Sequence, residues 1–220
     1  MEKDLEKFQD NFDEVIHSCQ RFTPFVRGIE FQKESVDTLD KLIDTIRQNK
    51  VIAIEAQKEE IANILLSMEQ MAISAKSEIE MVILIKEDKI NEAWDKLIDA
   101  QMSMRGAMQA HPTGTTHLEP YVDKLIAYEK LLFPNQLFMS TGLIAGAGEC
   151  SICGSEYGTC NHLKGKAYMG KFCHEIIKEV KQLNEVSIVE DPASKRCRAY
   201  TITGDGKNRD IMTWRESKSE

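Results

Sequence analysis

A dense cluster of cysteine and histidine residues between positions 150 and 173 is the feature that most constrains how this chain folds. The segment reads CSICGSEYGTCNHLKGKAYMGKFC and contains four of the chain's six cysteines and one of its five histidines. Its Cys-x2-Cys-Gly start is typical of a zinc knuckle, in which two thiolates bind one ion and a glycine lets the turn close. Five side chains compete for the four places of a tetrahedral site: Cys150, Cys153, Cys160, His162 and Cys173.

We predict a closed Cys3His zinc site formed by Cys150, Cys153, Cys160 and His162, with Cys173 in reserve as a replacement for Cys160 or His162. The segment has few large apolar residues, so zinc would supply folding energy, of order 10 kcal/mol, that its small core lacks. The N-terminus lacks a signal-peptide pattern, so we expect a reducing, cytoplasmic location, where this spacing favours a metal over disulfides. A closed set has no open coordination position, so we expect the zinc to be structural and predict no catalytic residue in this segment.

The residues that follow the cluster, from Leu183 to Ala193, read LNEVSIVEDPA. This run resembles the EVSxVxxPA segment near the end of the fold of tailed-phage prohead maturation proteases. Together with the Cys-x2-Cys-x6-Cys-x-His spacing and the Gly165-x2-Tyr168-x-Gly170 pattern, it is similar to a small zinc module of uncharacterised phage and prophage proteins. The resemblance covers about residues 149–203 and implies a phage, prophage or antiviral-defence setting. It carries over no catalytic residue, because nothing upstream matches the strand-rich body of the protease.

Upstream of the cluster, apolar residues recur at spacings of three and four, which predicts amphipathic helices over residues 2–21, from Ser35 onward, and over 51–87, 89–110 and 118–132. The longest helix, over 51–87, has a heptad-like seam interrupted only at Lys58. The seam consists of Ile54, Ile61, Leu65, Met68, Ala72, Ala75, Ile79 and Val82. A helix of this span is roughly 50 Å long. Its seam is buried either against the other helices of the chain or against a second copy, and both arrangements remain open.

These patterns predict a mainly α protein with a helical bundle or coiled-coil-like region followed by a small zinc-stabilised β-rich module. We place an acidic helical domain at 1–140, a hinge in the glycine-rich stretch 141–148, the zinc module at 149–203 and a polar tail at 204–220. Strands are expected over 175–182, 185–189 and 197–203, with turns at Leu183-Asn184 and at Gly204-Asp-Gly206.

The charge distribution limits the classes of partner. The chain of 220 residues has 28 basic and 36 acidic residues, a net charge of −8. From residue 149 onward there are 12 basic and 11 acidic residues, so the upstream part, with 16 and 25, has a net charge of −9. Such a region does not suit a phosphate backbone; only Lys164, Lys166 and Lys171, in the zinc segment, offer nucleic-acid contacts. The sequence has no run of 18 apolar residues that would predict a membrane span, and it has no glycine-rich nucleotide-binding loop.

A second candidate site lies in the helical part. Arg105 and His111 form an Arg-x5-His pattern similar to the loose signature of HEPN ribonucleases, in which arginine would steady phosphate charge and histidine would assist proton transfer. The residue after the arginine is Gly106, where that family usually has a polar residue, and His117 lies nearby in the following loop.

We therefore expect a non-enzymatic zinc-binding scaffold or adaptor that forms a homo-oligomer or docks a partner protein through its helices. A helical ribonuclease centred on Arg105 and His111, and a nucleic-acid-binding zinc module, are the alternatives.

Overall fold

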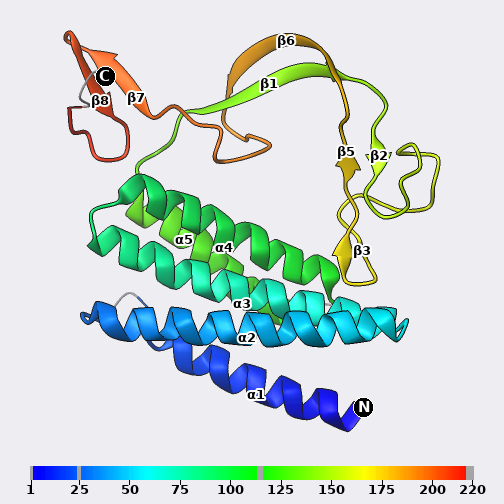
Figure 1. Cartoon of the computed structure of the whole chain (residues 1–220). Helices are drawn as coiled ribbons and strands as arrows, with labels where there is room; N and C mark the ends of the chain where they lie inside the picture. Colours follow the sequence, from blue (N-terminus) through cyan, green and yellow to red (C-terminus); the bar gives the residue numbers. More distant parts are fainter. Residues whose placement is uncertain (1, 24–25, 113–115, 217–220) are drawn as a thin grey trace. The chain divides into compact units, whose positions relative to one another are not determined.

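The computed structural model describes residues 2–23, 26–112 and 116–216, without the side chains of residues 2–6 and 116 (Figure 1). The chain divides into two compact units. The helical unit contains residues 1–125 together with 165–172, and the β unit contains residues 126–164 and 173–220. The division therefore falls near residue 125 and inside the metal-binding segment, and not at the predicted boundary near residue 140.

Five α-helices in the described ranges confirm the prediction of a helix-rich N-terminal part. They are α1 (Glu2–Gln20), α2 (Ile29–Glu55), α3 (Glu59–Lys86), α4 (Ile90–Ala110) and α5 (Glu119–Leu132), with a short 3-10 helix, η1 (Thr116–Leu118), before α5. In the helical unit α3 lies between α2 and α4, and α1 packs against α2 and α3 (Figure 1).

The single long helix predicted over 51–87 is wrong, because α2 continues to Glu55 and α3 starts at Glu59. Gln57 adopts the left-handed conformation, with φ 55°, and ends α2. Its N–H donates to the carbonyl of Ile54, and the N–H of Lys58 donates to that of Ala53, which is the hydrogen-bond pattern of a Schellman motif. Residues 48–50, which could have formed a turn, stay helical.

The turn between α3 and α4 repeats this geometry. Asp88 has φ 63°, its N–H donates to the carbonyl of Ile85, and the N–H of Lys89 donates to that of Leu84. Two three-residue turns therefore fold α2, α3 and α4 back on one another.

The predicted seam is buried inside this single chain. Its members on α3 from Leu65 to Val82 are each at most 5% exposed, and Ile54 and Ile61 pack against the same core. The first of the two arrangements left open by the sequence, burial against the chain's own helices, is the one observed. A second copy is not needed to cover the seam.

Small residues let α3 and α4 approach closely. Ser67 and Ser74 of α3 are fully buried, and their hydroxyls donate to the carbonyls of Ala107 and Ala100 on α4 at 2.8 and 2.7 Å. The carboxylate of Glu78, also fully buried, accepts hydrogen bonds from the Tyr121 hydroxyl and the Lys124 amine at the start of α5. A buried carboxylate is tolerated only with such partners, so this cluster fixes the start of α5 on α3.

The strand-rich C-terminal part consists of short antiparallel pairs. They are β1 (Phe138–Ala145) with β6 (Val180–Val189), β2 (Glu149–Cys150) with β5 (Glu175–Ile176), β3 (Ala167–Tyr168) with β4 (Lys171–Phe172), and β7 (Thr201–Gly204) with β8 (Lys207–Asp210). The β3–β4 hairpin belongs to the helical unit and the other pairs to the β unit.

Two predictions for this part are wrong. The expected hinge at 141–148 is largely strand β1, which pairs with β6 over its whole length. The expected turn at Leu183-Asn184 lies inside β6, where the register shifts between Gly142 and Leu143 and the strand absorbs the extra residue as a β-bulge. Glycine content suggested flexibility, but pairing with a strand about forty residues away orders this segment.

The turn predicted at Gly204-Asp-Gly206 is confirmed. Asp205 and Gly206 have φ values of 53° and 73° and join β7 to β8, as in the type I′ turn that favours Asp-Gly. The predicted polar tail at 204–220 thus starts with a strand, and residues 217–220 lie outside the described part of the chain.

A close approach of the β3–β4 hairpin to α2 and α3 requires a glycine. The N–H of Gly170 donates to Asn63 Oδ1 at 2.8 Å, and φ at Gly170 is 71°. A Cβ atom there would lie 3.1 Å from Lys50 Cδ and 3.3 Å from Ile54 Cδ1. A side chain at position 170 would therefore strain the backbone and push these two residues aside.

Among the described helices, none combines the length and the apolar character that crossing a bilayer requires.

The core of the helical unit predicts a sharp contrast between two isoleucines of α2. Ile46 is fully buried and Ile52 is 63% exposed. Ile46→Ala should lower the free energy of unfolding by about 2–5 kcal/mol through lost burial and the cavity left behind. The same change at Ile52 should alter it by less than about 0.5 kcal/mol. Urea unfolding followed by helical circular dichroism measures both, and equal effects would contradict the packing described here.

Candidate metal centre

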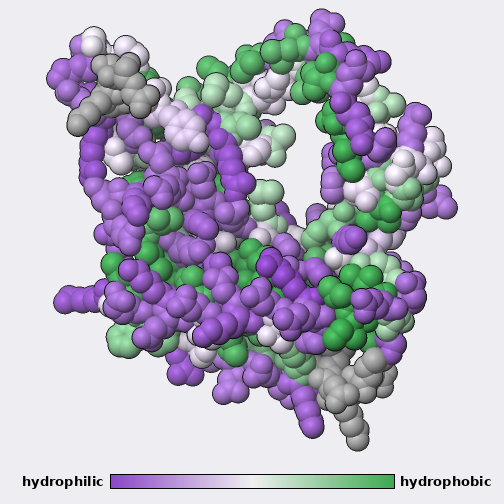
Figure 2. Space-filling model, viewed as in Figure 1, coloured by the Kyte–Doolittle hydropathy of each residue, from purple (hydrophilic) through white to green (hydrophobic). Residues whose placement is uncertain are grey.

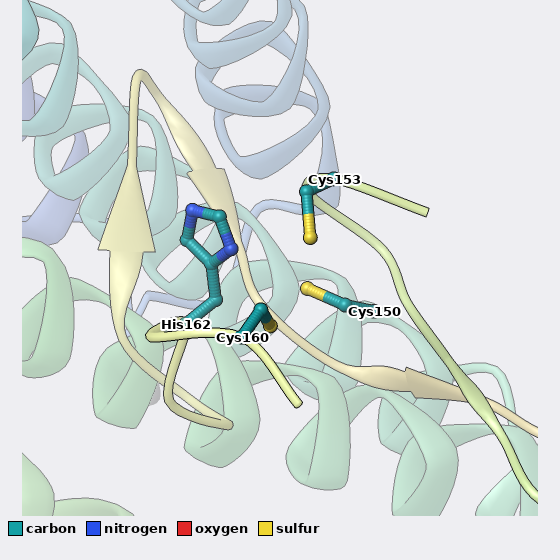
Figure 3. Close-up of side chains that lie close together, drawn as sticks. All are labelled: Cys150, Cys153, Cys160 and His162. Atoms are coloured by element: carbon teal, nitrogen blue, oxygen red, sulfur yellow. The ribbon is translucent and has the colours of Figure 1, made fainter. Parts of the chain in front are cut away.

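The structure brings the four predicted ligands together in the β unit. The Sγ atoms of Cys150, Cys153 and Cys160 and a ring nitrogen of His162 all lie within 4.8 Å of one another. Figure 3 shows the three thiols and the imidazole converging from two loop segments. Cys150 ends β2, Cys153 follows in the next turn, and the other two residues come from the loop before β3. This group can hold one metal ion.

A tight turn positions the first pair of thiols. The N–H of Gly154 donates to the carbonyl of Cys150, and the N–H of Cys150 donates to the carbonyl of Ser155, both at 2.8 Å. Gly154 has φ 72°, a conformation that disfavours side chains. The glycine of the Cys-x2-Cys-Gly pattern therefore closes the loop that aims Cys150 and Cys153 at the same point.

Pairing of β2 with β5 brings a fifth candidate to the centre. The register sets Cys150 opposite Glu175, two residues after Cys173. The Sγ atoms of Cys150 and Cys173 are 3.8 Å apart, and both residues are 1% exposed. A tetrahedral ion with metal–sulfur bonds of about 2.3 Å places two sulfurs about 3.8 Å apart. Cys173 is therefore at ligand distance from Cys150 and remains an alternative to Cys160 or His162.

The thiols influence one another's protonation. Burial raises the pKa of the Cys150 thiol, but hydrogen bonds from the backbone of Cys153 and Ile152 and from the thiols of Cys153 and Cys160 lower it to about 7. Hydrogen bonds with Ser155, first through its side chain, lower the pKa of Cys153.

The other two thiols shift in the opposite direction. A backbone hydrogen bond at His162 lowers the pKa of Cys160, but burial and the thiols of Cys150 and Cys153 together raise it. Burial, followed by the neighbouring Cys150 thiol, raises the pKa of Cys173. Ionisation of the first thiol makes ionisation of a neighbouring thiol less favourable, because the two negative charges repel. A cation in the centre would relieve this repulsion.

The three lysines singled out in the sequence do not form one cluster within a unit. Lys166 precedes β3 and Lys171 lies in β4, both in the helical unit, whereas Lys164 belongs to the β unit. All three are exposed.

The two residues of the ribonuclease-like pattern, Arg105 and His111, do not line the same pocket. His111 and His117 line a pocket of about 490 Å³ in the helical unit, and their ring centroids are 6.5 Å apart. Burial, and then the charge of His117, lower the pKa of His111. Arg105 is exposed on α4 and is not one of the described residues that line this pocket. Sequence reasoning did not predict Tyr121 as a lining residue, because it comes from the next helix.

Comparisons of the chain with protein-family models, with curated proteins and with solved structures found no match.

The cluster predicts one zinc ion per chain, bound by Cys150, Cys153, Cys160 and His162. Cys153→Ser should lose the ion and the ordered β2–β5 region while keeping the helical signal, because the helices have their own core. Cys173→Ser, the matched control, should still bind one ion. Elemental analysis gives the stoichiometry, and thiolate-to-metal absorption of the Co²⁺-substituted protein reports the number of thiolate ligands.

Less than about a tenth of an ion per chain with the module still folded would contradict the site. Loss of one thiolate ligand from the Co²⁺ spectrum in Cys173→Ser would show that Cys173 is a ligand instead of Cys160 or His162.

Proposed function

We propose that the chain is a non-enzymatic, zinc-stabilised adaptor that docks a partner protein through its helical unit. The observation that carries the docking role is a groove of about 660 Å³ on the helical unit with an apolar floor and an acidic rim. Val36 of α2 and Ile83 and Leu84 of α3 supply apolar lining. The charged lining comes from all three long helices: Lys33, Asp37, Glu80, Glu92, Asp95 and Lys96.

The charge of the groove favours a basic partner. Its four carboxylates and two amines give a net charge of −2, and the Lys96 amine is already paired with Glu80 at 2.6 Å. A groove of apolar floor and charged rim is typical of sites that accept one face of an amphipathic helix. We therefore propose a basic amphipathic segment of a partner protein as the ligand. The acidic balance of residues 1–148 supports attraction of such a segment.

The metal in this proposal is zinc with a structural role. Three thiol donors and one imidazole within 4.8 Å of one another suit Zn²⁺, and four protein ligands would leave no position for water or substrate. The ion would replace the apolar core that the small strand pairs of the β unit lack. We also propose a phage, prophage or antiviral-defence setting, which rests on the resemblance of residues 149–203 alone.

Docking through the groove predicts that charge reversal at its rim weakens partner recovery. Asp37 is exposed at the rim, and Asp44 is exposed two turns further along α2 outside the groove. Asp37→Lys should reduce the amount of the specific partner that copurifies from native cells about fivefold, whereas Asp44→Lys should leave it unchanged. Quantitative mass spectrometry of both purifications gives the ratio. Equal recovery of the partner with the two variants would show that the groove is not the docking site.

The ribonuclease alternative predicts a different outcome. Because Arg105 does not line the pocket with His111, we expect the zinc-loaded protein to leave single-stranded and structured RNA intact. Gel assays with a repurified sample test this, with His111→Ala as the matched variant. Cleavage that persists through repurification and disappears in His111→Ala would replace the adaptor proposal with the ribonuclease.

A further inference from the structure

The paired strands β1 and β6, which we call the ribbon, have one face that is apolar along its length. Side chains alternate along a strand, so Met139, Thr141, Leu143 and Ala145 point to the same side of β1. The register sets Ile188, Val186, Leu183 and Val180 directly opposite these four residues. Two register shifts in β6, which leave Asn184 and Lys181 without a paired position on β1, keep this pairing on one side.

This apolar face is exposed within the described part of the chain. Six large side chains on it have exposed fractions of 37–69%. They are Met139, Leu143, Val180, Leu183, Val186 and Ile188. Figure 2 shows hydrophobic side chains along the ribbon.

The opposite face of the ribbon is mixed: four of its eight paired positions are polar, and Phe138 pairs with Val189 at one end. It includes the paired positions Ser140 with Ser187, Gly142 with Glu185, and Ile144 with Gln182. A strand pair with one mixed and one apolar face has the pattern of a sheet whose apolar side is covered. Two strands alone are marginally stable in water, so the ribbon gains most from a covering layer.

We propose that the apolar face packs against the same face of a second copy of the chain, forming a four-stranded sandwich about a two-fold axis. This proposal goes beyond the adaptor function, because it involves neither the acidic groove nor the metal ligands. The six side chains expose roughly 600 Å² in total, so two copies would bury about 1,200 Å², the lower limit of standard specific interfaces. A patch of this size is also at the upper end of what monomers expose.

Charge favours this face over the helical surfaces as a contact between copies. The acidic excess lies in residues 1–148, so the helical surfaces of two copies repel each other. None of the eight paired positions on the apolar face carries a charge, and Glu185 lies on the opposite face. Contact through this face therefore places no like charges against each other, and salt should strengthen the contact by screening the remaining repulsion.

Adjacent residues of β6 provide a matched test in the zinc-loaded, full-length protein. Leu183 is on the apolar face and 62% exposed, and Gln182 is exposed on the opposite face. Sedimentation velocity from about 1 to about 100 µM should show wild-type mass rising from 25.0 kDa toward twice that value, with a midpoint in the tens of micromolar. Leu183→Lys should raise the midpoint at least tenfold, and Gln182→Lys should leave it unchanged.

Each outcome decides the proposal. A wild-type protein that stays monomeric at about 100 µM overturns it, and the face is then covered by another protein or by the chain's own helical unit. A dimer that Leu183→Lys and Gln182→Lys affect equally also overturns it, because the contact then lies elsewhere. Leu183 is exposed and not part of a core, so unchanged circular dichroism in both variants is expected and separates dissociation from unfolding.

Discussion

The burial of α3 on more than one side is the constraint on which the helical unit depends. Its seam residues Leu65, Met68, Ala72, Ala75 and Ile79 share one core with buried residues of α2. Ser67 and Ser74, in contrast, donate hydrogen bonds to carbonyls of α4. A helix with apolar and small polar groups around much of its circumference is unstable as a surface helix. Packing between two neighbours covers both sides, and the left-handed residues Gln57 and Asp88 make this possible by reversing the chain in three residues.

For the β unit, the proposed source of order is a bound metal ion. The unit's strand pairs are two to ten residues long, and most of its large apolar side chains remain exposed. In this unit three thiols and an imidazole lie within 4.8 Å of one another, and the thiols repel one another once they are ionised. A metal ion converts that repulsion into attraction, so a single ion would order several turns that apolar packing does not hold.

The sequence predicted those parts of the structure that depend on local spacing. The ends of α1, α4 and α5 agree with the apolar periodicity to within one or two residues, because each helix has a continuous stripe and a clear stop. The four clustered ligands span only residues 150–162, so two short turns suffice to bring them together. The Asp205-Gly206 turn could also be predicted from the sequence, because few dipeptides favour two successive positive φ values.

The features that the sequence did not predict depend on distant partners or on residues that give no local signal. Gln57 is not a glycine, and nothing in the sequence marked a helix end there; the helix end near Asp88 was predicted, but its left-handed conformation was not. The partner of β1 lies about forty residues further along the chain, and the glycine-rich composition of 138–148 hid the strand. The pocket containing His111 gathers residues from four α-helices and from η1, so no spacing within one helix could define it.

The grouping of the β3–β4 hairpin with the helices has a consequence for any attempt to dissect the protein. The chain passes between the two units three times, after residues 125, 164 and 172, so no single cut separates them. A fragment ending near residue 140 would lack the hairpin and leave the amide of Asn63 without Gly170. Each unit is thus built from segments that alternate along the chain. A stable helical fragment would need the hairpin joined to the helices by circular permutation or by a short engineered linker.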